Sequence, residues 1–273
     1  MSDLHVNGAV DTQQSVPDCV FFPERSSRTA RLLVAAAAVV SGLAMGSTLE
    51  SGHVMPLLLV AALCGGVLST WSPCGYSSIS LLRPSGKGGQ ALMRFLPVFA
   101  VHGLGYALGA AVLGAALGMM GHALGLGGFG IVAGLVLLGG LGLFYGLHQL
   151  DFIKMPYPQR RAQVPHDARQ RFPKWVVSLL YGFSLGLDYL TYVQTPLLYL
   201  VTVAAVLTGS PLEAILLIGV FNLGRYLPVA ATLLPVSDAA TQRWLSRHQE
   251  TAAVVDGAIL IAVGVGLGVF ALL

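Results

Sequence analysis

The chain has 273 residues, of which 55% are hydrophobic and only 10% are charged, and its mean hydropathy is +0.75. A soluble domain carries about a quarter charged residues, so this composition excludes an ordinary soluble domain and indicates a protein that uses the bilayer as its solvent. The formal net charge of +3 does not indicate nucleic-acid binding. The basic residues lie beside apolar segments, where they set the orientation of the protein in the membrane.

Seven apolar segments are long enough to cross a membrane, since a crossing helix needs about 20 apolar residues. Lipid offers no partner for backbone N–H and C=O groups, so each segment is predicted to be α-helical. The predicted fold class is an all-α membrane protein with seven transmembrane helices, an N-terminal helix and two groups of three. The predicted spans are residues 30–48, 54–82, 91–119, 126–148, 175–207, 212–235 and 252–272.

The connections between these spans differ in charge. Fourteen of the fifteen Lys and Arg residues lie in alternate connections, and the other connections hold none. Positive residues stay in the cytoplasm, so the pattern predicts a multi-pass bacterial inner-membrane protein with a cytoplasmic N-terminus and a periplasmic C-terminus. Residues 1–29 are predicted to be a disordered cytoplasmic tail. Residues 149–174 are predicted to be a basic cytoplasmic loop, solvated or in contact with lipid headgroups.

The first span has an alternative interpretation. Arg31, the apolar run after it and the small residues near Ala44 also fit a secretory signal peptide. The tail before Arg31 is long for the start of such a peptide, which favours a retained transmembrane helix. The topology of the other six spans is the same under both interpretations.

Two segments of the chain share a short pattern. Residues 101–108 and 220–227 each contain a Leu-Gly step closely followed by Tyr, and each follows an unusually long apolar span with a proline. Residues 54–148 and 175–273 are therefore predicted to be two three-helix halves that are inverted in the membrane. Such halves place a binding site at their interface near the bilayer midplane. Chance similarity between Gly-rich apolar helices is the alternative.

Two charged residues fall near the middle of predicted spans. Asp188 and Arg225 lie at similar depth on antiparallel neighbouring helices. A charge at the bilayer centre costs roughly 2.5–3.5 kcal/mol on insertion scales, so the two are expected to pair, joined by Asn222, Tyr192 or Tyr226. The pair either fixes the register of the helices or forms a substrate or proton site between the halves.

Two other polar residues lie within the spans. Asp256 lies a few residues inside the last span and is expected to be structural, within reach of cytoplasmic water. His102 is expected to be a hydrogen-bonded core residue, because no second His or Cys lies one helical turn away. The sequence predicts no metal site, no cofactor and no nucleic-acid partner.

Three cysteines are too few for a disulfide framework and lack zinc-binding spacing. Cys74 follows Pro73, which removes a backbone donor and favours a kink in the second span. Cys74 is a candidate thiol for a mixed disulfide with a partner protein, since exchange requires a thiolate to attack a disulfide sulfur. The alternative is a small buried residue beside a kink. Cys64 is expected to be structural and Cys19 incidental.

The stretch Leu-Ser-Thr-Trp-Ser-Pro-Cys-Gly-Tyr at residues 68–76 resembles the first redox motif of the CcdA/DsbD transmembrane family. The resemblance, over roughly residues 54–272, implies that family's inverted-repeat fold and electron transfer from cytoplasmic thioredoxin through a reversible disulfide. In the family a second Pro-Cys step supplies the other cysteine. Here, with the segment aligned on Pro196, Val193 occupies that position. The dithiol is therefore incomplete, and the resemblance does not imply an enzyme.

A narrower resemblance covers most of the chain. The stretch at residues 70–78, the Leu-Leu-Arg-Pro at 81–84 and the extra N-terminal span resemble the MauF family of methylamine-utilisation membrane proteins. That resemblance implies an accessory role in maturation or export of periplasmic methylamine dehydrogenase. The implied partners are a periplasmic thioredoxin-like maturation protein and other methylamine-utilisation membrane proteins. Three mechanisms stay open: a thiol relay through Cys74, a transporter with a midplane site at Asp188 and Arg225, or a membrane scaffold.

Overall fold

The computed structural model of the chain describes residues 25–72, 89–127, 132–156, 158, 172–233 and 237–273. Within these ranges every regular element is a helix and no strand occurs, which confirms the predicted all-α class. The α-helices are α1 (Arg28–Thr48), α2 (Val54–Leu68), α4 (Gly89–Ala123), α5 (Val132–Gln149), α7 (Lys174–Gly186), α8 (Leu197–Leu207), α9 (Pro211–Tyr226) and α10 (Asp238–Leu272). The short 3-10 helices are η1 (Ser51–His53), η2 (Ser69–Trp71) and η3 (Leu227–Leu233).

Six helical segments in the described part of the chain are long and apolar enough to cross a membrane. They comprise α1, α2 with its flanking turns, α4, α5, α9 with the start of η3, and α10. A multi-pass membrane protein is the class that such a set of helices indicates. The remaining predicted span is represented by α7 and α8, and α8 has only 11 residues, too few to cross about 30 Å of hydrocarbon alone.

The fifth predicted span is interrupted. The sequence predicts one helix over residues 175–207, but the chain leaves the helical conformation at 187–196. Asp188 ends α7 with a left-handed backbone, φ 52°. Pro196 precedes the first residue of α8, where its missing N–H breaks no helical hydrogen bond. The prediction of one unbroken helix is therefore wrong. The polar residues at 188–195 and Pro196 interrupt the apolar run where the backbone leaves the helix.

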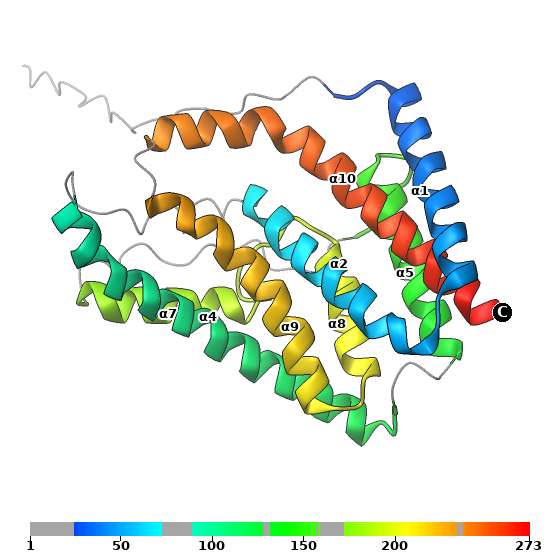
Figure 1. Cartoon of the computed structure of the whole chain (residues 1–273), viewed down its shortest axis with the longest axis horizontal. Coiled ribbons are helices and arrows are strands. Elements are labelled where there is room, and N and C mark those ends of the chain that lie inside the picture. The colour runs from blue at the N-terminus through cyan, green and yellow to red at the C-terminus, as the bar shows by residue number, and fades with distance from the viewer. Residues whose placement is uncertain (1–24, 73–88, 128–131, 157, 159–171, 234–236) are drawn as a thin grey trace, which may run out of the picture.

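Figure 1 shows a bundle in which helices far apart in the sequence lie side by side. The long α4 packs against α7 and α9, α2 packs against α9, and α10 packs against α5 and α1. α8 lies among α2, α4, α5 and α9. Residues 197–201 at the start of α8 are all buried, so the second part of the interrupted span belongs to the interior of the bundle.

The start of α10 and the end of α9 differ from the prediction. α10 begins at Asp238, well before residue 252, and the Ser237 hydroxyl accepts a hydrogen bond from the Ala240 N–H at its first turn. The polar sequence of these turns does not look like a membrane span, yet the helix is continuous through it. α9 ends at Tyr226 and tightens into η3, since Pro228 cannot donate the hydrogen bond that an α-helix needs.

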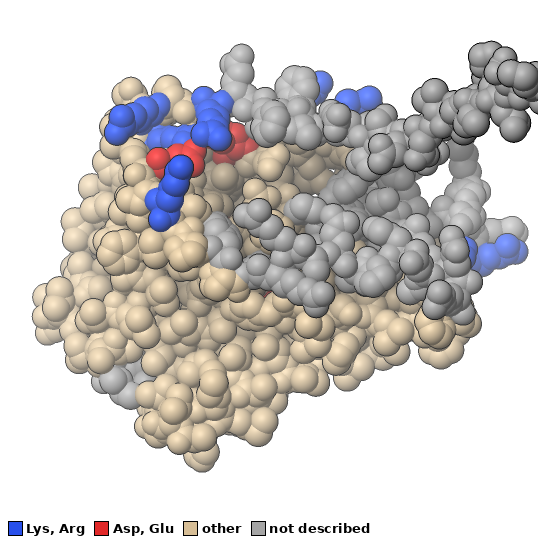
Figure 2. Space-filling view, turned by 180° about the vertical axis from the view of Figure 1, so that it is seen from behind, with Lys and Arg blue, Asp and Glu red and all other residues tan. Residues whose placement is uncertain are grey.

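The starts of α1, α4, α7 and α10 lie toward the upper and left side of Figure 1, as do the ends of α2, α5 and α9. At this end the buried Arg31 of α1 donates from Nη1 to Asp151 and from Nη2 to Glu250 of α10, both at 2.6 Å. Figure 2 shows basic side chains gathered with acidic ones at the upper edge of one face, whereas the lower part of that face is uncharged. The ion pairs hold the first turn of α1 against the turn that follows α5 and against α10.

Glycines set the distance between several helices. Gly66 of α2 faces Gly224 of α9, and a Cβ on Gly224 would overlap the carbonyl oxygen of Leu63. Backbone-to-backbone contact of this kind is typical of membrane helices, which associate through small residues. The contact between α4 and α7 has the same construction, with two Gly-x-x-x-Gly pairs at residues 105, 109, 182 and 186.

Gly224→Ala is expected to destabilise the protein by about 1–3 kcal/mol, because the added methyl group would push α2 and α9 apart. Gly219→Ala is the matched control on the same helix, since nothing lies within 4 Å of a Cβ at that position. The measurement is thermal unfolding of the purified protein in detergent. Equal stability of the two variants would contradict the close contact.

Candidate functional site

Asp188 lies where α7 ends, and its side chain is completely buried. Asp and Asn tolerate the left-handed conformation better than other residues with a Cβ, because their short polar side chains bond locally. The Asp188 N–H donates to the Leu185 carbonyl at 3.0 Å and closes the last turn of α7. The turn thus holds a carboxylate in the protein interior, where it requires partners.

Arg225 and Asn222 of α9 supply those partners. Arg225 Nη1 donates to Asp188 Oδ1 and to the Leu185 carbonyl, both at 2.6 Å. Asn222 Nδ2 donates to Asp188 Oδ2 at 3.1 Å and to the Gly186 carbonyl at 3.3 Å. These two side chains neutralise the buried carboxylate and add side-chain donors to the carbonyl groups at the end of α7. We refer to Asp188, Asn222 and Arg225 as the buried triad.

The buried triad has hydrogen-bonding capacity to spare. Arg225 Nε and Nη2 and Asn222 Oδ1 are buried, and none has a partner among the residues that the structure describes. A buried polar group without a partner costs about 1–3 kcal/mol, and more if it is charged. The free edge of a guanidinium presents parallel N–H groups that suit a planar acceptor. The triad can therefore hold a small polar ligand or water beside its ion pair.

Aromatic side chains surround the guanidinium. Its central carbon lies 5.9 Å from the centroid of the Tyr106 ring, within cation–π range. Tyr106 packs against Tyr226 and His102 at centroid distances of 5.8 and 5.1 Å. Tyr192, a predicted site residue, packs against the cluster that contains Tyr106. These rings form an apolar wall beside the triad, which strengthens its electrostatic interactions by excluding water.

His102 is buried at the contact between α4 and α7. Its Nδ1 lies 2.9 Å from the Ser178 carbonyl, so Nδ1 carries the proton of this hydrogen bond. Nε2 has no partner within the described part of the chain. The described residues contain no group of three His, Cys, Asp or Glu that could hold a metal ion.

Asp256 is more deeply buried than its place near the end of the predicted span suggests. Its side chain is 1% exposed. Its Oδ1 accepts from the Thr195 hydroxyl at 2.7 Å, and its Oδ2 accepts from Gln149 Nε2 at 2.9 Å. The reason is that α10 begins at Asp238, so residue 256 lies deep in a long helix covered by α5 and by the chain before Pro196.

Pro73 and Cys74 lie outside the described residues, as does Cys19. The chain that leads to them is described as far as Ser72. Ser72 is fully buried, and its hydroxyl donates to the Ser69 carbonyl at 2.5 Å. Just before it, the Trp71 indole donates to the Leu245 carbonyl of α10 at 3.0 Å. Cys64 on α2 is a free, half-buried thiol.

Comparison with curated proteins gives near full-length matches. The chain is 62% identical to the methylamine utilization protein MauF of Paracoccus versutus, over 97% of the chain and 96% of that protein. It is 58% identical to MauF of Paracoccus denitrificans over 100% and 99%, and 53% identical to MauF of Methylorubrum extorquens over 95% and 93%. The chain belongs to the MauF family. No protein-family model and no solved structure matches this MauF-family chain.

Thr195 and Gln149 are site residues that the sequence reasoning missed. Gln149 is the last residue of α5, and Thr195 immediately precedes Pro196. A buried carboxylate such as that of Asp256 needs polar partners, but the residues beside it in the sequence do not identify them. Gln149, Thr195 and Asp256 come from separate elements, so only the folded chain brings them together.

Arg225→Met is expected to destabilise this MauF-family protein by about 3–5 kcal/mol, because it leaves the Asp188 charge buried without a cation. Adding Asp188→Asn should recover part of that loss, since Asn removes the charge and tolerates the left-handed backbone. The measurement is thermal unfolding in detergent.

Arg247→Met, at an exposed position of α10, is the control and should unfold like the wild type. A double variant no more stable than Arg225→Met would argue that the pair is not coupled.

Proposed function

We propose that this protein is an inner-membrane accessory protein of methylamine utilization, which supports maturation or export of periplasmic methylamine dehydrogenase. The names of relatives 50–62% identical to it support the role in methylamine utilization. The maturation role and the partners, a periplasmic thioredoxin-like protein and other methylamine-utilisation membrane proteins, rest on the family resemblance.

The proposed topology has a cytoplasmic N-terminus and a periplasmic C-terminus. Four helices start at the same end of the bundle, and each carries a basic residue within its first two turns: Arg28, Arg94, Lys174 and Arg243. This common placement supports the assignment of that end to the cytoplasm. The first helix is proposed to be retained. Its contacts support retention, because Gly42 lies against the Ala262 backbone and Arg31 is buried in ion pairs.

The proposed architecture is the inverted repeat, with α2, α4 and α5 in one half and α7 with α8, α9 and α10 in the other. The packing supports this pairing, since α2 lies on α9 as α7 lies on α4. Individual contacts repeat as well. Gly66 faces the carbonyl of Phe221, and Gly182 faces that of His102. In the first contact the glycine lies in the first half and the carbonyl in the second, and in the second contact the reverse holds. Two halves related by a repeat are expected to show such an exchange.

The helix ends support the same correspondence. The Ser72 N–H donates to the Ser69 carbonyl at 3.0 Å, and the Asp188 N–H donates to the Leu185 carbonyl at 3.0 Å. The two donors, residues 72 and 188, are 116 positions apart in the sequence, and so are the two acceptors, residues 69 and 185. By this correspondence Cys74 lies opposite residue 190 and not Val193, and neither position is a cysteine. The second half thus has the ion-paired Asp188 at the position where the first half has Ser72. Ser72 precedes Cys74 by two residues.

The mechanism that the geometry favours is a carrier-type site at the buried triad. The observation that carries it is the set of buried, unpartnered groups, Arg225 Nε and Nη2 and Asn222 Oδ1, beside an interruption in a membrane helix. Interrupted helices at the interface of inverted halves are where carriers bind their substrates. A small molecule with a planar acceptor group fits the free guanidinium edge. The ion pair uses Nη1 alone, so Nε and Nη2 remain available to such a molecule.

A thiol relay through Cys74 is the second candidate. The observation in its favour is that the chain enters the Pro73–Cys74 step from the fully buried Ser72. Directly before it, the Trp71 indole donates to the Leu245 carbonyl of α10, in the other half. A thiol close to that contact would lie near the interface of the halves. Since the chain has no second cysteine in the later half, the resolving thiol would come from a partner protein.

Arg225→Lys tests the carrier-type site. Lysine keeps the charge that pairs with Asp188 but lacks the free guanidinium edge. Methylamine dehydrogenase activity in the periplasm of cells that carry the variant is expected to fall about tenfold or more, as loss of a charged hydrogen bond implies. Immunoblotting should show a wild-type protein level, and Arg247→Lys should keep full activity. Full activity of Arg225→Lys would leave the triad a structural role alone.

Cys74→Ser tests the relay, with Cys64→Ser as the matched control on the preceding helix. The relay predicts that Cys74→Ser abolishes dehydrogenase maturation and that Cys64→Ser does not. It also predicts a mixed disulfide between Cys74 and a thioredoxin-like protein after thiol trapping in membranes. Normal maturation with Cys74→Ser removes the relay. If Arg225→Lys is silent as well, the membrane-scaffold alternative remains.

A further inference from the structure

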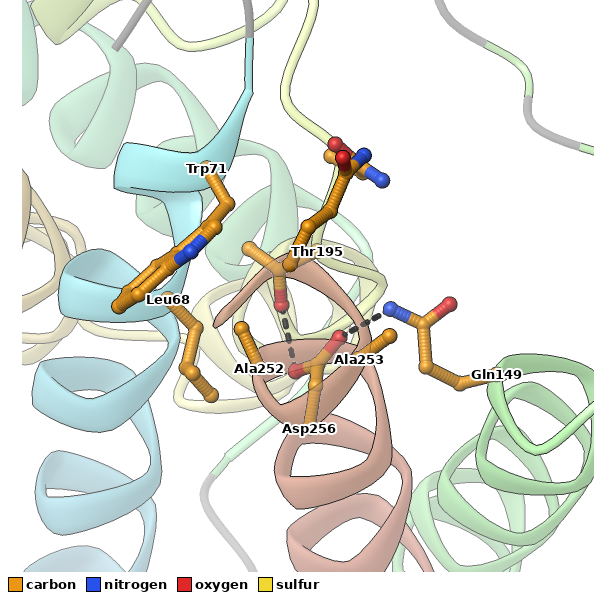
Figure 3. Close-up of a pocket in the computed structure, with 9 residues that line it drawn as sticks. Leu68, Trp71, Gln149, Thr195, Ala252, Ala253 and Asp256 are labelled. Atoms are coloured by element: carbon orange, nitrogen blue, oxygen red, sulfur yellow. Dashed lines mark hydrogen bonds between the residues drawn. The ribbon is translucent and has the colours of Figure 1, made fainter. Parts of the chain in front are cut away.

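Asp256 is a second buried carboxylate, at the other end of the interrupted segment from Asp188. Figure 3 shows it between the Thr195 hydroxyl and the Gln149 amide, at 2.7 and 2.9 Å. The two carboxylates differ in one respect. Asp188 pairs with Arg225, whereas none of the ion pairs of the described residues includes Asp256. A carboxylate that is 1% exposed therefore has only uncharged donors.

An ionised carboxylate in that setting is costly. Two neutral hydrogen bonds replace only part of the hydration lost on burial, and the usual resolution is that the group binds a proton. The partners of Asp256 also fit the protonated form. Oδ2 accepts from the Gln149 amide, as the carbonyl oxygen of a carboxylic acid does. In the protonated form the direction of the Thr195 contact is reversed. The O–H group on Oδ1 donates to one lone pair of Thr195 Oγ1, and the other lone pair accepts the Leu197 N–H at 3.2 Å.

A small pocket connects Asp256 with the surface. It is lined by Leu68, Trp71, Gln149, Gln194, Thr195, Gln249, Ala252, Ala253 and Asp256. Gln249 is exposed at the rim. The cavity volume of about 10 Å³ is close to the lower limit for one water molecule, so it suits a proton path through water and leaves no room for a hydrated metal ion. Gln249 adjoins Glu250, so the pocket opens at the end of the bundle that carries the basic residues.

Among the residues that the structure describes, no other titratable side chain lines this pocket. Nearby titratable groups on the packed helices have partners elsewhere. On α10, Glu250 binds Arg31 of α1 at 2.6 Å. On α5, His148 Nδ1 lies 3.0 Å from the Met155 N–H, and the Tyr145 hydroxyl donates to the Pro156 carbonyl at 3.0 Å. Asp256 is therefore the group in this pocket that can exchange a proton.

We propose that Asp256 is a reversible proton-binding site, protonated at rest and in exchange with the basic end of the bundle through this pocket. Uptake converts the carboxylate and one proton from water into a carboxylic acid, and release reverses it. The Thr195 hydroxyl is the contact that passes the change on. It accepts the N–H of Leu197 at the start of α8, so loss of the Asp256 proton alters the bonding of the helix that follows the interruption. The proton site does not depend on the proposed role in methylamine utilization.

Infrared spectroscopy of the purified full-length protein in liposomes tests the site. At neutral pH the wild type should show the C=O band of a protonated carboxyl group, and the band should fade as the pH rises. Asp256→Asn should lack that band, whereas Asp188→Asn should retain it, because the Asp188 carboxylate is ion-paired. Thr195→Val should shift the band without removing it, since only the hydrogen bond is lost. Identical wild-type and Asp256→Asn spectra over the whole pH range would overturn the proposal.

Two further measurements keep the test independent of how the variants fold. Dicyclohexylcarbodiimide, an apolar reagent for protonated carboxyl groups, should modify Asp256 and not Asp188 in the wild-type protein, as read by peptide mass mapping. A wild-type protein without an adduct on Asp256 contradicts a resident proton. Replacing choline chloride with sodium chloride at constant pH should leave the infrared band unchanged. Loss of the band would make Asp256 a sodium site and overturn the proton site.

Discussion

The constraint on which the structure depends is that backbone groups within an apolar interior need partners wherever a helix stops. Residues 187–196 cross the interior without helical hydrogen bonds. At one end, Arg225 and Asn222 donate to the carbonyls of Leu185 and Gly186. At the other end, the Thr195 hydroxyl accepts the first free N–H of α8. Side chains of α9 and of the interrupted segment itself thus bind backbone groups at the two helix ends, as a helix break in a membrane requires.

This solution works only if the helices approach closely. Arg225 directly follows Gly224, whose backbone lies against Gly66 of α2. The close contact fixes α9 at the depth from which the guanidinium reaches both the Asp188 carboxylate and the end of α7. A buried ion pair adds little net stability because desolvation offsets its attraction. Its contribution is to specify one position of α9 relative to the interrupted segment.

The apolar runs and the spacing of Lys and Arg were enough to predict the helices, because hydropathy is a property of the sequence alone. The contact of Asp188 with Arg225 was predictable because a charge at that depth needs an opposite charge. The extent of the break before Pro196 was not, since Asp188 and Pro196 mark its ends but nothing in the sequence shows that all ten residues between the helices leave the helical conformation. Thr195, Gln149 and Asp256 come from three elements, so their meeting depends on tertiary packing. The start of α10 was missed because its first turns are polar.

In the proposed repeat, the two halves end their first helices in different ways. Ser72 ends one with a neutral hydroxyl bonded to a carbonyl within its own turn. Asp188 ends the other with a carboxylate that binds a different helix. A local neutral bond breaks and forms again at little cost, whereas separating a buried ion pair leaves two unpaired charges. The end of α2 is therefore held by a local, neutral bond, and the end of α7 by a bond to α9 that is costlier to break.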